Sequence, residues 1–140
     1  MTRQRMIRDE PEAHGDAEVL RAHPMDEQSL RENAETNFGL YGFYGLSVFY
    51  PIGDWTKERI LTEKLSEVTQ VTVFRRADLA TSDLRVLPTG AEPHGDIVGV
   101  PVTGRPENLP ADRDALIAAV LASRHHLEQN PYHRGGEEMP

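Results

Sequence analysis

The run of residues 40–50 constrains the fold of this chain more than any other segment. Its apolar side chains alternate between two faces, with Leu46 and Val48 on one face and Phe43 and Phe49 on the other. A strand that is apolar on both faces is buried on both sides. We therefore predict a central strand over residues 40–50 in a layered domain.

Two segments have the periodicity of amphipathic helices. Apolar residues recur at helical spacing over 54–68 and over 110–128, and Pro110 suits the first turn of the second helix. Asp26 is a suitable N-cap for a third helix, short and polar, that reaches about residue 33.

Three further segments are predicted to be short strands. Residues 71–74 alternate between apolar and polar side chains, and residues 84–87 and 96–102 are rich in strand-forming side chains. The Pro- and Gly-containing loop 88–95 separates the last two, so they are expected to pair antiparallel. Residues 77–82 are predicted to be a connector.

These elements predict one α+β domain over residues 17–130, with a small, partly antiparallel sheet of four to five strands packed by two amphipathic helices. A chain of 140 residues supports one hydrophobic core. Residues 1–16 are predicted to be a flexible N-terminal arm and residues 131–140 a flexible C-terminal tail, because neither has a repeating apolar face. Deleting residues 1–12 and 133–140 should then leave the fold intact.

Composition excludes several classes of protein. The chain has no cysteine, so it has neither disulfides nor thiolate metal sites. No apolar run is long enough for a signal peptide or a membrane span, so we expect a soluble cytoplasmic protein without membrane partners. The net charge of −8 repels the phosphates of nucleic acid, so duplex DNA is not an expected partner.

His94 and Asp96 are the candidate catalytic residues. They flank Gly95 where the loop 88–95 meets a predicted strand, a type of junction that often carries function. Imidazole titrates near neutral pH, so His94 could transfer a proton while Asp96 orients it. The alternative is a turn histidine that bonds the backbone.

Arg75, Arg76 and Tyr44 are the candidate ligand-binding residues. The two arginines follow a strand and could grip the phosphate of a small phosphorylated ligand, or pair with surface acids such as Asp78. Tyr44 belongs to the main aromatic concentration of the chain, which could stack on a base or pack in the core.

No metal and no cofactor are expected. His125 and His126 are adjacent on a predicted helix, where side chains about 100° apart do not share a metal ion. The sequence also lacks the glycine-rich phosphate loops, the metalloprotease His-Glu-x-x-His motif and the nucleophile elbow that identify large enzyme classes.

Several short motifs resemble a pattern found in uncharacterised small proteins of actinobacteria and their phages. The resemblance covers about residues 40–100, and its motifs lie at 44–49, 73–74, 84–89 and 93–98. It implies a bacterial or phage origin but no activity, and it assigns no functional residue.

Two hypotheses for function follow. The first is a non-catalytic interaction or regulatory protein that engages a protein partner, or its own copy, through its acidic surface and aromatic-rich strand. The alternative is a toxin-like or defence-associated enzyme acting on a nucleotide or RNA, in which Arg75 or Arg76 binds phosphate and His94 transfers the proton. Convergence of these side chains would favour the enzyme.

Overall fold

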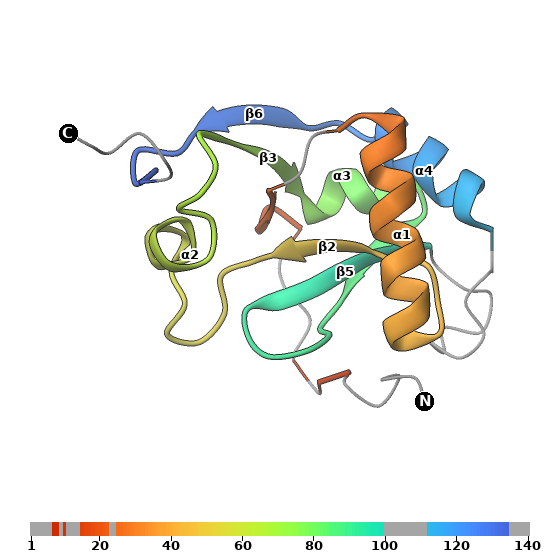
Figure 1. Cartoon of the computed structure of the whole chain (residues 1–140), viewed down its shortest axis with the longest axis horizontal. Helices are drawn as coiled ribbons and strands as arrows, with labels where there is room; N and C mark the ends of the chain where they lie inside the picture. The colour runs from red at the N-terminus through yellow and green to blue at the C-terminus, as the bar shows by residue number, and fades with distance from the viewer. Residues whose placement is uncertain (1–6, 9, 11–14, 23–24, 100–111, 135–140) are drawn as a thin grey trace.

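The computed structural model describes residues 7–8, 10, 15–22, 25–99 and 112–134, and Figure 1 shows their arrangement. The elements in chain order are β1 (Glu18–Arg21), α1 (Glu27–Tyr41), β2 (Leu46–Phe49), α2 (Lys57–Glu63), β3 (Gln70–Arg75), α3 (Arg76–Thr81), β4 (Leu84–Leu87), β5 (His94–Gly99), α4 (Arg113–Ala122) and β6 (His126–Gln129). None of the helices in these segments is long and apolar enough to cross a membrane.

The strands form one sheet in the order β4-β5-β2-β1-β3-β6, and each neighbouring pair is antiparallel. The predicted α+β class is confirmed, as is the antiparallel pairing of 84–87 with the strand that follows the loop. The described sheet has six strands where four to five were predicted, and four helices accompany it where two amphipathic helices were predicted.

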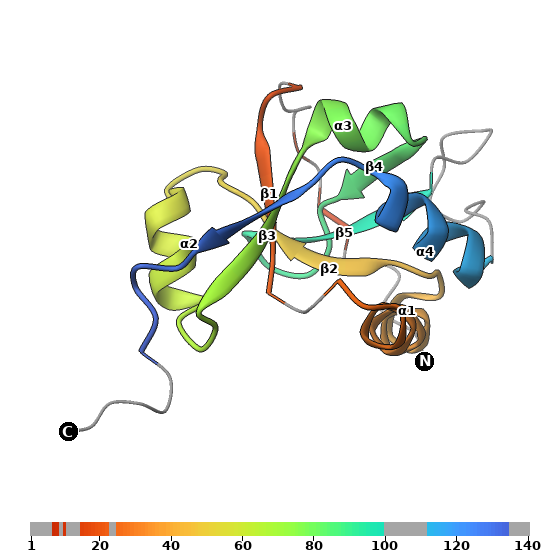
Figure 2. The ribbon, with the colours of Figure 1, turned by 90° about the horizontal axis from the view of Figure 1, so that it is seen from above.

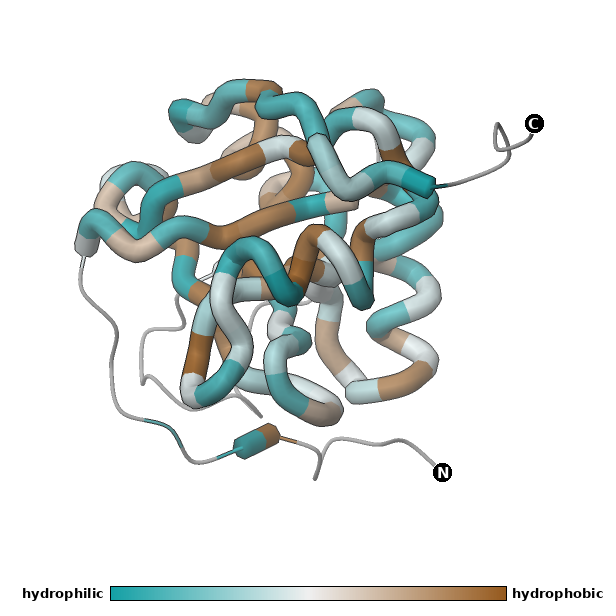
Figure 3. The backbone as a smooth tube through the Cα atoms, turned by 90° about the vertical axis from the view of Figure 1, so that its left-hand side faces the viewer, coloured by the Kyte–Doolittle hydropathy of each residue, from teal (hydrophilic) through white to brown (hydrophobic). Residues whose placement is uncertain are grey.

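The helices divide between the two faces of the sheet (Figure 2). Side chains of α1, α3 and α4 pack on one face, together with Val19, Leu46, Val48, Phe74 and Ile97. The other face is covered by α2, which packs Ile60, Leu61 and Leu65 against Leu20, Val71 and Val73. The hydrophobic residues are accordingly concentrated along the strands (Figure 3).

The predicted strand over 40–50 is too long. Helix α1 continues to Tyr41, and Gly42 ends it with a left-handed φ of 86° while its N–H donates to the carbonyl of Phe38. The strand proper, β2, begins at Leu46, and it lies between β5 and β1, so its predicted central position is confirmed.

The predicted N-cap of the first helix is confirmed, but its predicted end is wrong. The Asp26 carboxylate accepts a hydrogen bond of 2.8 Å from the N–H of Ser29. The helix then runs past residue 33 because its buried face continues to the end of the helix and consists of Leu30, Ala34, Asn37 and Tyr41. Asn37 is polar, which hides this face from a hydrophobicity pattern.

Three other boundaries differ from the predictions. Helix α2 is capped by Thr56 and spans only Lys57–Glu63, and the predicted connector 77–82 is largely helix α3. The predicted helix over 110–128 is in fact two elements, because α4 ends at Ser123 and the chain then extends to pair β6 with β3. Residues 110 and 111 lie outside the described residues.

Gly95 is required by close packing in the sheet. A Cβ atom at this position would lie 2.7 Å from the carbonyl oxygen of Leu87 and 2.7 Å from Cε1 of Tyr50. Neither a strand carbonyl nor a buried ring can move away cheaply. We expect Gly95→Ala to lower the free energy of unfolding by about 1–3 kcal/mol in urea titrations.

Gly99 supplies the matched control on the same strand. A Cβ atom there meets nothing within 4 Å, so Gly99→Ala should change the free energy of unfolding by no more than about 0.5 kcal/mol. Equal urea midpoints for the two variants would contradict the packing role of Gly95.

Candidate functional site

A polar network begins where helix α1 meets strands β1 and β2. The two strands pair at Leu20 and Phe49, and at Ser47 side chains satisfy the backbone of β2 instead. Asn33 accepts from the N–H of Ser47 at 2.8 Å, and Nη1 of Arg21 donates to the Ser47 carbonyl at 3.0 Å. Arg21 also donates to Asn33 at 2.9 Å. The side chains of Arg21 and Asn33 thus take the place of the β1 backbone in satisfying the N–H and C=O groups of Ser47.

Asp96 is the buried acid of this network. Its side chain is fully buried, and it accepts hydrogen bonds of 2.6 Å from Asn37 Nδ2 and 2.6 Å from Thr89 Oγ1. Burial raises the pKa of Asp96 to about 7, although Thr89, the charge of Arg21 and Asn37 all act to lower it. Loss of hydration therefore outweighs the hydrogen bonds at this carboxyl group.

Arg21 is the buried base of the same network. It is fully buried, and its Nε and Nη2 atoms have no hydrogen-bond partner among the described residues. Burial lowers the pKa of Arg21 to about 10 against the opposing charge of Asp96 and Asp26. At neutral pH the guanidinium remains charged, so the Asp96 carboxylate is its main compensation inside the protein.

His94 is connected to Asp96 through Thr89. The Nδ1 atom of His94 lies 3.1 Å from the carbonyl oxygen of Thr89 and 3.2 Å from its hydroxyl, which itself donates to Asp96. The carbonyl can only accept, so this geometry assigns the proton to Nδ1. Burial, aided by the charges of Arg8 and Lys64, lowers the pKa of His94, so the ring is neutral at pH 7.

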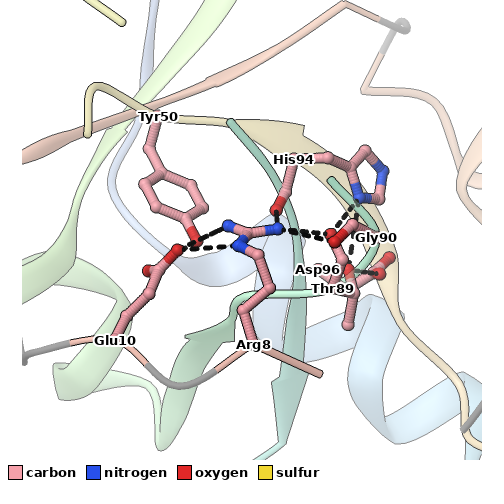
Figure 4. Close-up of polar contacts among 7 residues, drawn as sticks. All are labelled: Arg8, Glu10, Tyr50, Thr89, Gly90, His94 and Asp96. Carbon is pink, nitrogen blue, oxygen red and sulfur yellow. Dashed lines mark hydrogen bonds and ion pairs between the residues drawn. The ribbon is translucent and has the colours of Figure 1, made fainter. Parts of the chain in front are cut away.

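Arg8 closes the other side of this cluster, as Figure 4 shows. Its Nη2 atom donates to Glu10 at 2.6 Å and to the hydroxyl of Tyr50 at 2.8 Å, and that hydroxyl donates to Glu10 at 2.9 Å. Its Nη1 atom donates to three carbonyl oxygens, those of Thr89, Gly90 and His94. We call Arg8, Glu10 and Tyr50 the clasp, because they join the N-terminal segment to the loop before β5.

The structure brings some of the predicted site residues together. His94 and Asp96 meet through Thr89, and Arg76 lies 4.8 Å from the ring centre of Tyr50 in the clasp. Arg75 instead pairs with Asp78 at 3.4 Å, the alternative given for it above. The functional roles assigned to these residues stay predictions.

Tyr44 makes no contact with this cluster among the interactions above, and its ring lies tilted against that of Phe38, with ring centres 4.6 Å apart. Most of the other aromatic side chains of the predicted strand are in the core, since Tyr41, Phe43 and Tyr50 are buried. These rings therefore stabilise the domain and leave little aromatic surface for a ligand.

Chemically, the cluster presents one oriented neutral imidazole beside a buried carboxyl group. Asp96 and Thr89 are fully buried, so they act on a ligand only through His94. Within the described segments, no group of three or more His, Asp or Glu side chains is arranged to hold a metal ion. His125 and His126 do not share a helix, because His126 opens β6 and His125 bonds the carbonyl of Ser123 at 2.7 Å.

The two edges of the sheet are a second candidate site, and they differ. Just past the end of β4, Ile7 bridges Thr89 and the N–H of Arg8 donates to the carbonyl of Pro88 at 2.6 Å, so the N-terminal segment contacts the chain at that end of the edge strand. At the other edge, β6 pairs only with β3 in the part of the chain that the structure describes.

The backbone of β6 alternates between β3 and solvent. Asn130 donates to the carbonyl of Thr69 at 2.8 Å, and β6 continues in register with β3. Alternation in an antiparallel ladder then directs the N–H and C=O groups of Leu127 and Gln129 outward. The side chain of Leu127 is also 61% exposed, which is unusual for a leucine on a strand.

Comparisons with known proteins give no family assignment: no family model, no curated protein and no solved structure matches the chain.

The clasp gives a direct test of the contacts made by the N-terminal segment. Arg8→Ala would remove the cation from the nearly buried Glu10 carboxylate and the donor from three carbonyls. We expect the free energy of unfolding to fall by about 2–3 kcal/mol in urea titrations. Deleting residues 1–12 removes the same contacts, so we no longer expect that deletion to be silent.

Arg31→Ala is the control for Arg8→Ala, because Arg31 forms an exposed pair with Glu27 on α1. Its loss should cost no more than about 0.5 kcal/mol. Indistinguishable melting curves for the two alanine variants would show that the clasp does not stabilise the domain.

Proposed function

We propose that this chain is a non-catalytic interaction protein that binds a protein partner by strand addition at the outer edge of β6. One observation carries the proposal: among the described residues, nothing pairs with the outward hydrogen-bonding groups of Leu127 and Gln129 at the β6 edge of the sheet. An open edge is a template for an added strand, which supplies main-chain affinity.

Two further observations favour binding over catalysis. The carboxyl group of Asp96, one of the two candidate catalytic residues, is fully buried and hydrogen-bonded to Asn37 and Thr89, so it cannot contact a substrate directly. At the opposite edge, Ile7 and Arg8 pair with the residues that directly follow β4, whereas the described residues place no such segment beside β6. The acidic surface, with a net charge of −8, favours partners that are basic or neutral.

A library of random dodecapeptides displayed on phage tests this proposal. We expect selection on the immobilised full chain to enrich strand-forming peptides that bind at β6. Gln129→Pro removes an outward N–H without removing a bond to β3, so it should weaken these peptides at least tenfold. Gln129→Ala keeps the N–H and should bind them like the wild type.

Equal binding by Gln129→Pro and Gln129→Ala would place the peptides elsewhere and overturn the proposal. So would a selection that yields no binding peptide. Melting curves of both variants establish that they are folded when binding is compared.

The orientation of His94 favours a second candidate function, an enzyme acting on a nucleotide or RNA. Its Nδ1 atom is held by Thr89, and its Nε2 atom makes no hydrogen bond to the described residues. A neutral imidazole with one nitrogen fixed is suited to accept a proton at the other. Turnover of nucleotides or short RNA that falls at least 100-fold in His94→Gln would support this function, and no turnover by the wild type would exclude these substrates.

A further inference from the structure

We infer that the strand added at β6 is β6 of a second copy of this chain, antiparallel and centred on Leu127. The inference rests on the proposed function of the β6 edge and adds the partner and the register. Its basis is that the sequence of β6 and the residue before it, His125 to Gln129, is complementary to itself when reversed.

The backbone permits this register. Leu127 and Gln129 direct their N–H and C=O groups outward, and the same alternation applies to His125. A twofold axis through Leu127 places Leu127 opposite the partner's Leu127 and Gln129 opposite the partner's His125. All three positions then exchange main-chain hydrogen bonds across the axis.

The charges select this register over its neighbour. Pairing centred on Leu127 sets His126 opposite the partner's Glu128, in the rungs where side chains approach most closely. A register centred on Glu128 would also satisfy the backbone, but it would set Glu128 opposite the partner's Glu128. An imidazole N–H opposite a carboxylate can donate a hydrogen bond to it, whereas two like charges directly opposite each other destabilise a sheet.

The charged groups that face this contact form one cluster. His126 Nε2 lies 2.8 Å from Glu128 Oε2, and Lys57 Nζ lies 2.8 Å from Glu128 Oε1 and 2.8 Å from Glu18 Oε1. The cluster therefore holds Glu128 in place along the strand. Pre-ordered side chains lose less conformational entropy on association.

The apolar part of the contact lies on the opposite face of the strand. Leu127 is 61% exposed in the single chain, and in this register it packs against the partner's Leu127. Association thus buries the most exposed large apolar side chain of the described residues. Because a short strand buries little area, we expect a weak dimer in the micromolar to millimolar range.

Sedimentation equilibrium of the full chain over a range of concentrations tests the inference. The wild type should form a reversible dimer, and Gln129→Pro should be monomeric, while Gln129→Ala associates as the wild type does. His126→Glu sets like charges opposite each other twice, so it should weaken the dimer roughly tenfold. The reciprocal double variant His126→Glu, Glu128→His restores opposite charges and should recover association.

A single cysteine reports the register, since the natural chain contains none. Leu127→Cys places two thiols opposite each other and should give a disulfide-linked dimer under mild oxidation. In Gln129→Cys the two thiols would lie four residues apart along the ladder, about 13 Å, which is too far to bridge. Cross-linking of Gln129→Cys as fast as Leu127→Cys would overturn the register.

Failure of this inference is distinguishable from failure of the proposed function. A wild type that stays monomeric at millimolar concentration while β6 still binds selected peptides would overturn the self-pairing alone. A dimer that Gln129→Pro and His126→Glu leave unchanged uses another surface, which also overturns the inference. Should His126→Glu lose its fold, His126→Gln removes the imidazole with no added charge and should still weaken the dimer.

Discussion

Replacing Val48 with aspartate should abolish folding. Val48 is fully buried in the hydrophobic core. It lies in the central strand β2, opposite Gly95 of β5. A carboxylate there loses its hydration among Leu46, Phe74 and other apolar side chains and gains no partner. The cost exceeds the stability of about 5–15 kcal/mol that a domain of this kind has, so circular dichroism should show an unfolded chain.

Two control variants show whether unfolding is caused by the buried charge itself, and not by any substitution of Val48 or by any added carboxylate. Val48→Ala deletes two methyl groups and should cost about 2–3 kcal/mol while leaving a cooperative thermal transition. Gln70→Asp places the same carboxylate at the exposed start of β3 and should stay folded. Native circular dichroism and a normal melting temperature for Val48→Asp would mean that this face of β2 is not packed.

The hydrophobic pattern predicts those parts of the fold in which apolar side chains alone decide the conformation. The central position of β2 and the strand β3 were predicted because Val48, Val71 and Val73 alternate with other residues, and the pairing of β4 with β5 was predicted from the turn-forming loop 88–95. At these places local propensity and tertiary packing agree.

The predictions failed where a polar residue lies on a buried face or where tertiary pairing determines the structure. Asn37 is buried because Gly45 and Asp96 bond its side chain, and this extends α1 over residues that look like a strand. Residues 126–129 continue a helical period, but pairing with β3 makes them a strand. Neither contact is visible from local sequence.

The candidate site was predictable only in part for the same reason. His94 and Asp96 are neighbours on one strand, so their proximity follows from the sequence. Arg8 reaches the same cluster from more than 80 positions away in the chain, and no local motif marks it. Arg21 ends the short strand β1, which also begins with a charged residue, so the local sequence does not mark it as the buried base of the network.

Asp96→Ala should be the most damaging substitution in that network. It would leave the buried charge of Arg21 without its carboxylate and would take the acceptor from Asn37 and from Thr89. Leaving buried donors without their acceptor costs about 1–3 kcal/mol for each group, which should appear as a large shift of the urea midpoint. Asp54→Ala, an exposed acid in the loop before α2, is the control and should cost no more than about 0.5 kcal/mol.

The pH dependence of the unfolding free energy shows whether the carboxyl group of Asp96 takes up a proton when the protein folds. Its pKa is about 7 in the folded protein, above the ordinary value of 3.8, so the folded state binds the proton more tightly than the unfolded state. This contribution to stability is complete below about pH 4 and is lost as the pH rises through about 7. The lowered pKa of His94 acts in the opposite direction, because stability from that group is lost as the pH falls through its ordinary value of 6.5.

The variant Asp96→Asn keeps His94 and removes only the carboxyl group. We therefore expect the unfolding free energy of the wild type, measured relative to Asp96→Asn, to fall between pH 5 and about pH 7 and to level off above it. A difference that stays constant or rises over this range would show that the charge of Arg21, and not burial, controls the ionisation of Asp96.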